Sequence, residues 1–192
     1  MTITKTNQKA FLVLDDGRIF EGNPWGCLGR TFGEAVFATG MTGYQETLTD
    51  PSYHKQVVVM TAPHIGNTGW NLEDNESNQI WVSGFVVRNP SPITSNWRSK
   101  TDLESELKRQ NIVGISGVDT RALTRHLRDR GAMRVGIFSG EDLSREEMVV
   151  EVRKFEQMSG SFLAKDVSTP KSYVVNAREL RFKVVALDLG IK

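Results

Sequence analysis

The feature that most constrains the fold is a short run of β-branched residues in the first third of the chain. Residues 56–62, QVVVMTA, contain three consecutive valines and stand between two polar stretches. A short apolar run of this kind, without polar alternation, is typical of a strand that is buried on both faces. Such a strand belongs inside a layered domain in which both sides of the sheet are covered.

The other predicted strands lie on both sides of this run. Phe11–Leu14, an Asp-Asp-Gly turn and residues 18–21 read as a hairpin. Residues 34–39 predict a strand, and 79–89 supply one or two more. After residue 100 the strands alternate with helices, at 112–116 and 133–140. The pattern predicts a mixed α/β domain with early hairpins.

Helix starts are marked by capping boxes, in which a Ser or Thr side chain and a Glu three residues later bond each other's backbone. Thr101 with Glu104 and Ser144 with Glu147 match this pattern. A further helix begins at Asp119 or Thr120 and stops at a glycine. The predicted helices cover 101–111, 119–131 and 144–158.

The predicted organisation has three parts. Residues 8–156 form the compact α/β domain. Periodicity fades over 157–181, which we expect to be a linker. Residues 182–192, FKVVALDLGIK, contain a run typical of a buried parallel strand, so we expect a second domain to begin there.

Composition excludes several classes of function. The 192 residues carry 24 basic and 23 acidic side chains, which gives no overall attraction to nucleic acid or an anionic membrane. Cys27 is the single cysteine, so an internal disulfide is impossible and a reducing compartment fits. The first eleven residues have no apolar signal core, and no run approaches the roughly 20 apolar residues of a membrane span. We expect a soluble, cytoplasmic protein.

Two polar stretches are too elaborate for simple connections. Residues 40–56, GMTGYQETLTDPSYHKQ, contain an Asp-Pro-Ser turn in which Asp50 can bond backbone amides and Pro51 fixes the chain direction. This pins the Ser52 hydroxyl at a defined place. Residues 63–77 form a second such stretch. Long, structured loops of this kind usually make contacts beyond their own domain.

Other candidate chemistry is weaker. Cys27 with His54 or His64 is a possible thiol–imidazole pair, but a buried thiol and two unrelated histidines are the favoured interpretation. We reject a metal site from Glu46, Asp50 and the two histidines, because two histidines ten residues apart match no usual ligand spacing. The glycines at 26, 29 and 33 indicate a tight turn, since no helix follows them.

The predicted helix 119–131 and its surroundings are locally basic. Two interpretations stay open: a solvated helix face, or a docking patch for an acidic partner protein. Nucleic acid is less favoured, because the patch lacks interleaved aromatic residues. The basic residues are Arg121, Arg125, Arg128, Arg130 and Arg134.

Four motifs, in order, resemble one protein family. They are FATGMTGYQETLTDPSYHKQVV, PHIGNTGWNLEDNES, SNWRS and GVDTRALTRHLRDRGAM. They closely resemble the amino-terminal domain of the small, glutamine-hydrolysing subunits of carbamoyl-phosphate synthetase, from about Phe11 to Phe155. VVALDLGIK resembles the first strand of that family's class I glutamine amidotransferase domain. The resemblance implies a three-layer β/β/α swivelling-type domain with a parallel central sheet.

The resemblance also implies a function. In the family, a Cys-His-Glu arrangement in the carboxy-terminal domain hydrolyses L-glutamine, and ammonia passes to a large subunit that uses bicarbonate and two ATP. Those catalytic residues have no match among these 192, so this chain alone is expected to be inactive. ATP and magnesium belong to the large subunit, and no metal or cofactor is expected here. The serine of the DPSY segment, Ser52, is implied to bind glutamine.

Two alternatives were weighed against a role as part of the synthetase. A free-standing module could occupy the large subunit without delivering ammonia. A thiol or metal enzyme built on Cys27 predicts that Cys27→Ala abolishes an activity, whereas we expect no effect. The apolar run at 182–192 favours the first interpretation, because a self-contained module gains nothing from an exposed apolar strand.

Overall fold

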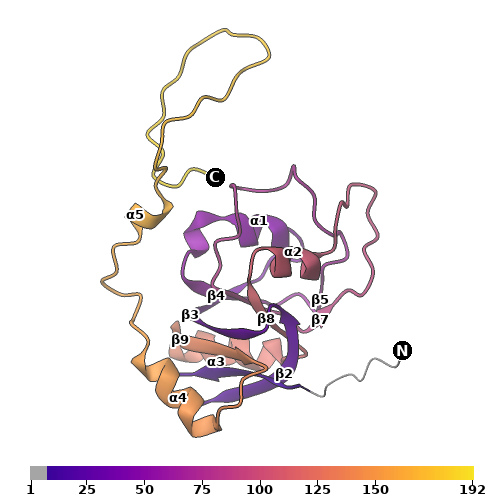
Figure 1. Ribbon diagram of the computed structural model, residues 1–192, viewed down its shortest axis with the longest axis vertical. Helices are drawn as coiled ribbons and strands as arrows, with labels where there is room; N and C mark the ends of the chain where they lie inside the picture. Colours follow the sequence, from indigo (N-terminus) through magenta and orange to yellow (C-terminus); the bar gives the residue numbers. More distant parts are fainter. Residues whose placement is uncertain (1–7) are drawn as a thin grey trace.

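The computed structural model describes residues 8–192. Its body is a closed seven-stranded barrel with strand order β1-β2-β8-β6-β4-β3-β9, and β5 and β7 form a separate two-stranded sheet (Figure 1). The residues on which we judged the absence of a leader lie mostly outside the described part. The strands are β1 Ala10–Leu14, β2 Ile19–Gly26, β3 Gly29–Ala38, β4 Gln56–Met60, β5 His64–Ile65, β6 Gly84–Val86, β7 Asn89–Pro90, β8 Val113–Ser116 and β9 Met133–Ser139.

The valine run forms a central strand, as predicted. β4 pairs in parallel with β3 on one side and with β6 on the other, and Val58 stands opposite Val36 and Phe85. All of β4 after its first residue is buried. β6 continues in parallel to β8, while β1, β2 and β9 join the barrel through antiparallel pairs. The mixed α/β prediction is confirmed, although the sheet closes on itself.

The helices cover the barrel outside and at one end. α1 (Tyr44–Thr49) and α2 (Leu103–Arg109) lie together, α3 (Thr120–Arg130) lies behind the strands, and α4 (Arg145–Lys154) lies on the opposite side from α1 (Figure 1). A 3-10 turn, η1 (Pro51–Tyr53), and a short α5 (Ala164–Val167) complete the helical elements of the described chain.

Alternation along the strands separates three cores. One core takes apolar side chains from all seven barrel strands, such as Leu12, and is joined by Leu123 and Leu127 of α3, so it fills the interior. On the outer face, Val58 packs in a second core with residues of α1 and α2. Val13 packs in a third core under α4. Period-2 alternation is what lets one strand serve two cores.

Two of the predicted helix caps are confirmed and one is wrong. Ser144 and Glu147 form a complete capping box at the start of α4, and Asp119 caps α3. α2, however, is capped by Asp102, whose side chain accepts a hydrogen bond from the amide of Ser105 at 2.8 Å. The predicted box of Thr101 with Glu104 is displaced by one residue, because an aspartate is an equally good cap.

The early strands are longer than predicted. β2 runs on to Gly26, and β3 begins at Gly29, so the tight turn uses only the first two glycines of the predicted turn. Gly33 lies inside β3, where an added Cβ would stand 2.5 Å from the carbonyl oxygen of Lys55. That glycine therefore serves close backbone approach, which a single sequence does not distinguish from a turn.

Two further expectations change. Only Gly84–Val86 and Asn89–Pro90 of the stretch 79–89 are strands, and they belong to different sheets. The first polar stretch is partly helical, since α1 and η1 lie within it.

The carboxy-terminal part forms a long arm beyond α4 (Figure 1). Apart from α5, residues 157–192 contain no helix or strand in the structure. The run predicted as a buried strand is exposed and irregular here, with Val185 97% exposed. A strand needs a neighbour to satisfy its backbone groups, and none of the described segments pairs with this one. The boundaries 8–156, 157–181 and 182–192 stay predictions.

No helix in the described part of the chain is long and apolar enough to cross a membrane.

Candidate functional site

Ser52 lies in a short turn between α1 and the central strand β4. The Oδ1 atom of Asp50 accepts a hydrogen bond from the backbone amide of Ser52 at 2.8 Å, and Pro51 occupies the first position of η1. The predicted aspartate turn is thus confirmed. The side chain of Ser52 is exposed, so the turn presents a hydroxyl at the surface in a fixed position.

Asp50 is a buried negative charge beside this hydroxyl. Its residue is 8% exposed, and its Oδ2 atom accepts a hydrogen bond from Lys192 Nζ at 2.6 Å. Burial raises the pKa of Asp50, but the hydrogen bonds from Lys192 and Ser52 outweigh it and hold the pKa below its ordinary value. Asp50 is therefore ionised at neutral pH.

The turn is tied to the segment that precedes β6. The hydroxyl of Ser77 donates to the carbonyl oxygen of Thr49 at 2.6 Å and accepts from the indole nitrogen of Trp81 at 2.7 Å. The amide of Glu76 donates to the Thr49 hydroxyl at 2.9 Å. Thr49 is fully buried, so these bonds fix the end of α1 and the start of the Ser52 turn together.

A cavity of about 650 Å³ separates this region from the carboxy-terminal arm. The arm also contacts the turn directly, since Asp166 Oδ2 lies 3.3 Å from His54 Nε2 and 3.5 Å from Lys55 Nζ. Ser52 lies beside the cavity and is not part of its wall, whereas Pro51 is. The wall consists of Pro51, residues 76–79, Trp81, residues 166–170, Tyr173, Asp188 and residues 190–192.

The second polar stretch folds against the amino-terminal end of α1. The side chain of Gln45 donates to the carbonyl oxygen of Asn71 at 2.5 Å and accepts from the Asn71 amide at 3.1 Å. Nearby, the Tyr44 hydroxyl donates to the carbonyl oxygen of Gly69 at 2.5 Å. Both Gln45 and Tyr44 are buried, so the loop is anchored through backbone atoms that strands would otherwise satisfy.

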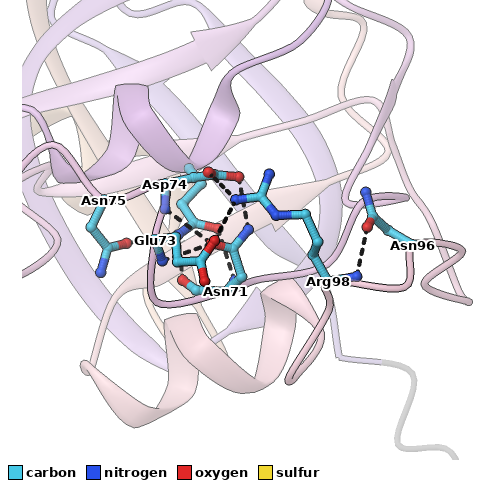
Figure 2. A network of polar contacts seen from close by, with 7 residues as sticks. Asn71, Glu73, Asp74, Asn75, Asn96 and Arg98 are labelled. Atoms are coloured by element: carbon cyan, nitrogen blue, oxygen red, sulfur yellow. Dashed lines mark hydrogen bonds and ion pairs between the residues drawn. The ribbon is translucent and has the colours of Figure 1, made fainter.

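Arg98 joins a third segment, SNWRS, to this loop. Its Nη2 atom donates to Asp74 Oδ1 at 2.5 Å and to Glu73 Oε2 at 3.2 Å (Figure 2). Asn71 holds the carboxylates in place by accepting from the amides of both residues and donating to Asp74 Oδ2. The hydrogen bonds from Asn71 and Arg98 hold the pKa of Asp74 below its ordinary value. We call Gln45, Asn71, Glu73, Asp74, Asn75, Asn96 and Arg98 the Asn71–Arg98 network.

The structure does not bring Cys27 together with a histidine in its described contacts. The Cys27 thiol faces the end of α2, with Sγ 3.5 Å from the carbonyl oxygen of Lys108. His54 contacts Asp166 and packs edge-on against Trp81, and His64 lies in β5. Within residues 8–192, no group of three or more His, Cys, Asp or Glu side chains is arranged to hold a metal ion.

The basic patch is smaller than predicted. Arg134 lies in β9, pairs with Asp15 at 3.0 Å, and donates to the carbonyl oxygens of Arg153 and Phe155. It therefore has a structural role. The other four arginines lie on α3 and are exposed, so a solvated face and a docking patch both remain possible interpretations of that helix.

Our reading of the residues did not find the network, although its parts lie in the quoted motifs. One local signal was present in Asn71-Leu72-Glu73-Asp74, since an asparagine often bonds the amides two and three residues ahead. The bond between Arg98 and Asp74 has no such signal, because it joins residues 24 positions apart.

Comparison with known proteins adds a family. A family model described as the carbamoyl-phosphate synthase small chain, CPSase domain, matches residues 12–137. The carbamoyl phosphate synthase small chain of Streptomyces coelicolor is 66% identical over 185 residues, which is 95% of this chain and 49% of that protein. The protein of the same name from Mycobacterium tuberculosis strain H37Rv is 58% identical over 191 residues, 96% of this chain and 51% of the relative. The chain thus spans about half the length of these curated relatives.

Proposed function

Because the chain belongs to the carbamoyl-phosphate synthase small-chain family, we propose that it forms the large-subunit docking part of a glutamine-dependent synthase. In this proposal the complete small chain hydrolyses L-glutamine, and the large subunit combines the ammonia with bicarbonate at the expense of two ATP. Magnesium and ATP are bound by the large subunit. The product, carbamoyl phosphate, serves pyrimidine and arginine synthesis in the cytoplasm.

Within this enzyme, we propose that Ser52 binds glutamine. The observation that carries the proposal is the turn itself, which fixes an exposed hydroxyl next to a buried, ionised carboxylate. A hydroxyl can donate to the carboxylate of an amino acid or accept from its ammonium group. Asp50 adds a negative charge that attracts an ammonium and disfavours a second carboxylate. A zwitterionic amino acid therefore fits if its ammonium end lies towards Asp50.

The catalytic Cys, His and Glu belong to a further domain in this proposal, and the segment alone is inactive. The exposed run at 182–192 supports it, since an apolar strand without a neighbour is what a divided sheet leaves behind. We propose that this run begins a class I glutamine amidotransferase domain, that 157–181 link it to the domain at 8–156, and that the latter has the swivelling-type layering of its family. Bound glutamine then ties the two domains together through Ser52.

The test is Ser52→Ala in a full-length small chain that carries these residues, assayed with its large subunit. We expect the KM for glutamine to rise by a factor that corresponds to about 1–3 kcal/mol, because a charged group of the substrate loses its partner. Synthesis from free ammonia is expected to stay unchanged, because it bypasses glutamine.

Ser159→Ala is the matched control, since Ser159 is also exposed but lies in the linker. An unchanged KM for glutamine in Ser52→Ala would count against the role of Ser52. A full-length small chain that binds no large subunit would instead support the free-standing or unrelated alternatives.

A further inference from the structure

Four large apolar side chains are exposed in the loops that the Asn71–Arg98 network holds together. Trp97 is 92% exposed and Met41 is 84% exposed, which is unusual for side chains of this size in a folded body. Leu72 and Ile93 are also exposed. We call these four residues and the network beside them the Leu72–Trp97 surface.

The network fixes this surface. Leu72 lies between Asn71 and Glu73, and Trp97 precedes Arg98, so the bond of Arg98 to Asp74 clamps the loops that carry both apolar residues (Figure 2). Holding an aromatic residue in place before binding reduces the entropy that association costs. Rigid, exposed tryptophans are among the residues that contribute most to protein interfaces.

The surface also has a hollow and a charge. A cavity of about 310 Å³ opens beside it, and its wall includes Met41, Glu46, Asp74 and Arg98. Counting Glu73, three carboxylates face one guanidinium group here. A partner that fits offers an apolar cluster around a lysine or arginine, which would enter the hollow near Glu46.

The remaining half of the small chain is a poor candidate for this position. The last described residue, Lys192, is bound to Asp50 at the carboxyl end of α1, whereas the Leu72–Trp97 surface lies at the amino end of that helix. The cavity under the carboxy-terminal arm shares no wall residue with the cavity beside Glu46. The chain therefore continues from a different face.

We infer that the Leu72–Trp97 surface is the docking site for the large subunit, which contacts it through an apolar cluster that surrounds a cationic side chain. This inference rests on the proposed function, which requires a large-subunit partner. It adds the location of the contact and the chemistry of the partner's surface.

The experiment measures the dissociation constant between a full-length small chain carrying these residues and its large subunit. We expect Trp97→Ser to raise the constant at least about tenfold, as loss of a central aromatic contact does. Leu72→Ser, on the opposite loop of the clamp, is expected to weaken binding as well. Phe162→Ser is the matched control, because Phe162 is an equally exposed aromatic residue of the arm, and its constant should stay unchanged.

Glu46→Lys tests the charge. It should weaken binding, and the difference from the unchanged chain should shrink as salt is raised, because screening removes the repulsion. Circular dichroism and thermal unfolding confirm that each variant is folded, and Leu72→Ser decides the question if Trp97→Ser is not.

The outcomes separate the two proposals. If the unchanged small chain binds no large subunit, the proposed function fails. If it binds, and folded Trp97→Ser and Leu72→Ser bind equally well, the docking site is wrong. Protection of Trp97 from a fluorescence quencher before the large subunit is added, or a homodimer that Trp97→Ser disperses, would also overturn it by naming another occupant.

Discussion

At the scale of the residue, Asp50 links the candidate site to the stability of the fold. One carboxylate oxygen holds the backbone of Ser52, and the other holds Lys192. Because the pKa of Asp50 is lowered in the folded protein, its ionised form contributes stability above the pKa of the unfolded chain, near 3.9. That contribution is lost as the pH falls through the lowered folded value.

Asp50→Asn should therefore flatten the acid side of the stability profile. We expect the variant to be less stable than the unchanged protein at pH 7, because it loses the charge partner of Lys192 but keeps an oxygen for Ser52. The difference should narrow below about pH 4, as the unchanged protein also loses its charge. Urea unfolding between pH 7 and pH 3 measures this, with the exposed Asp129→Asn as control. A difference that is constant over this range would contradict the assignment.

At the scale of the element, the start of α2 shows how a cap is chosen. Thr101 and Asp102 are adjacent and both are good capping residues, but the structure uses Asp102. The amide and hydroxyl of Ser105 both donate to its carboxylate, at 2.8 and 2.6 Å. Thr101 instead contributes backbone bonds with Trp70, and these bonds fix where the helix can begin.

A pair of substitutions separates the two candidates. Asp102→Ala should lower the free energy of unfolding by about 1 kcal/mol, the usual cost of a lost cap. Thr101→Ala should change it much less, because its side chain makes none of the described hydrogen bonds. Urea unfolding of both variants at pH 7 gives the comparison. Equal losses would mean that the helix can begin at either residue.

At the scale of the whole molecule, the packed body ends shortly after α4. Phe155, the residue after that helix, stacks on Phe32 of β3 with ring centroids 5.6 Å apart. Most of the large apolar side chains beyond it are exposed, including Phe182 and Val184. Contacts of the arm with the body are mainly polar and partly exposed, so they add little to stability.

A chain shortened to residues 8–156 should therefore fold alone. We expect one cooperative unfolding transition, with a free energy within about 1–2 kcal/mol of the 192-residue chain. It should also bind less of a hydrophobic dye, because the exposed run is gone. Shortening to residue 140 is the control, since it removes Met148 and Val152 from the core under α4 and should prevent stable folding. An unstable 8–156 fragment would show that the arm belongs to the domain.

The sequence by itself determined the elements whose signals are local. The both-face burial of β4 followed from three adjacent valines, the start of α4 from its capping box, and the Ser52 turn from Asp50 and Pro51. Each of these depends on residues a few positions apart, so side-chain period and backbone preference are sufficient.

Only the tertiary structure decided what depends on distant partners. Gly33 is needed because Lys55 passes close to β3, and Arg98 is fixed by Asp74 from another loop. Closure of the barrel required β1 to pair with β9 across more than 100 residues. The run around Val185 has the composition of a buried strand but stays exposed where no strand pairs with it. Composition records how a segment can be buried, and only the assembled fold supplies the surface that buries it.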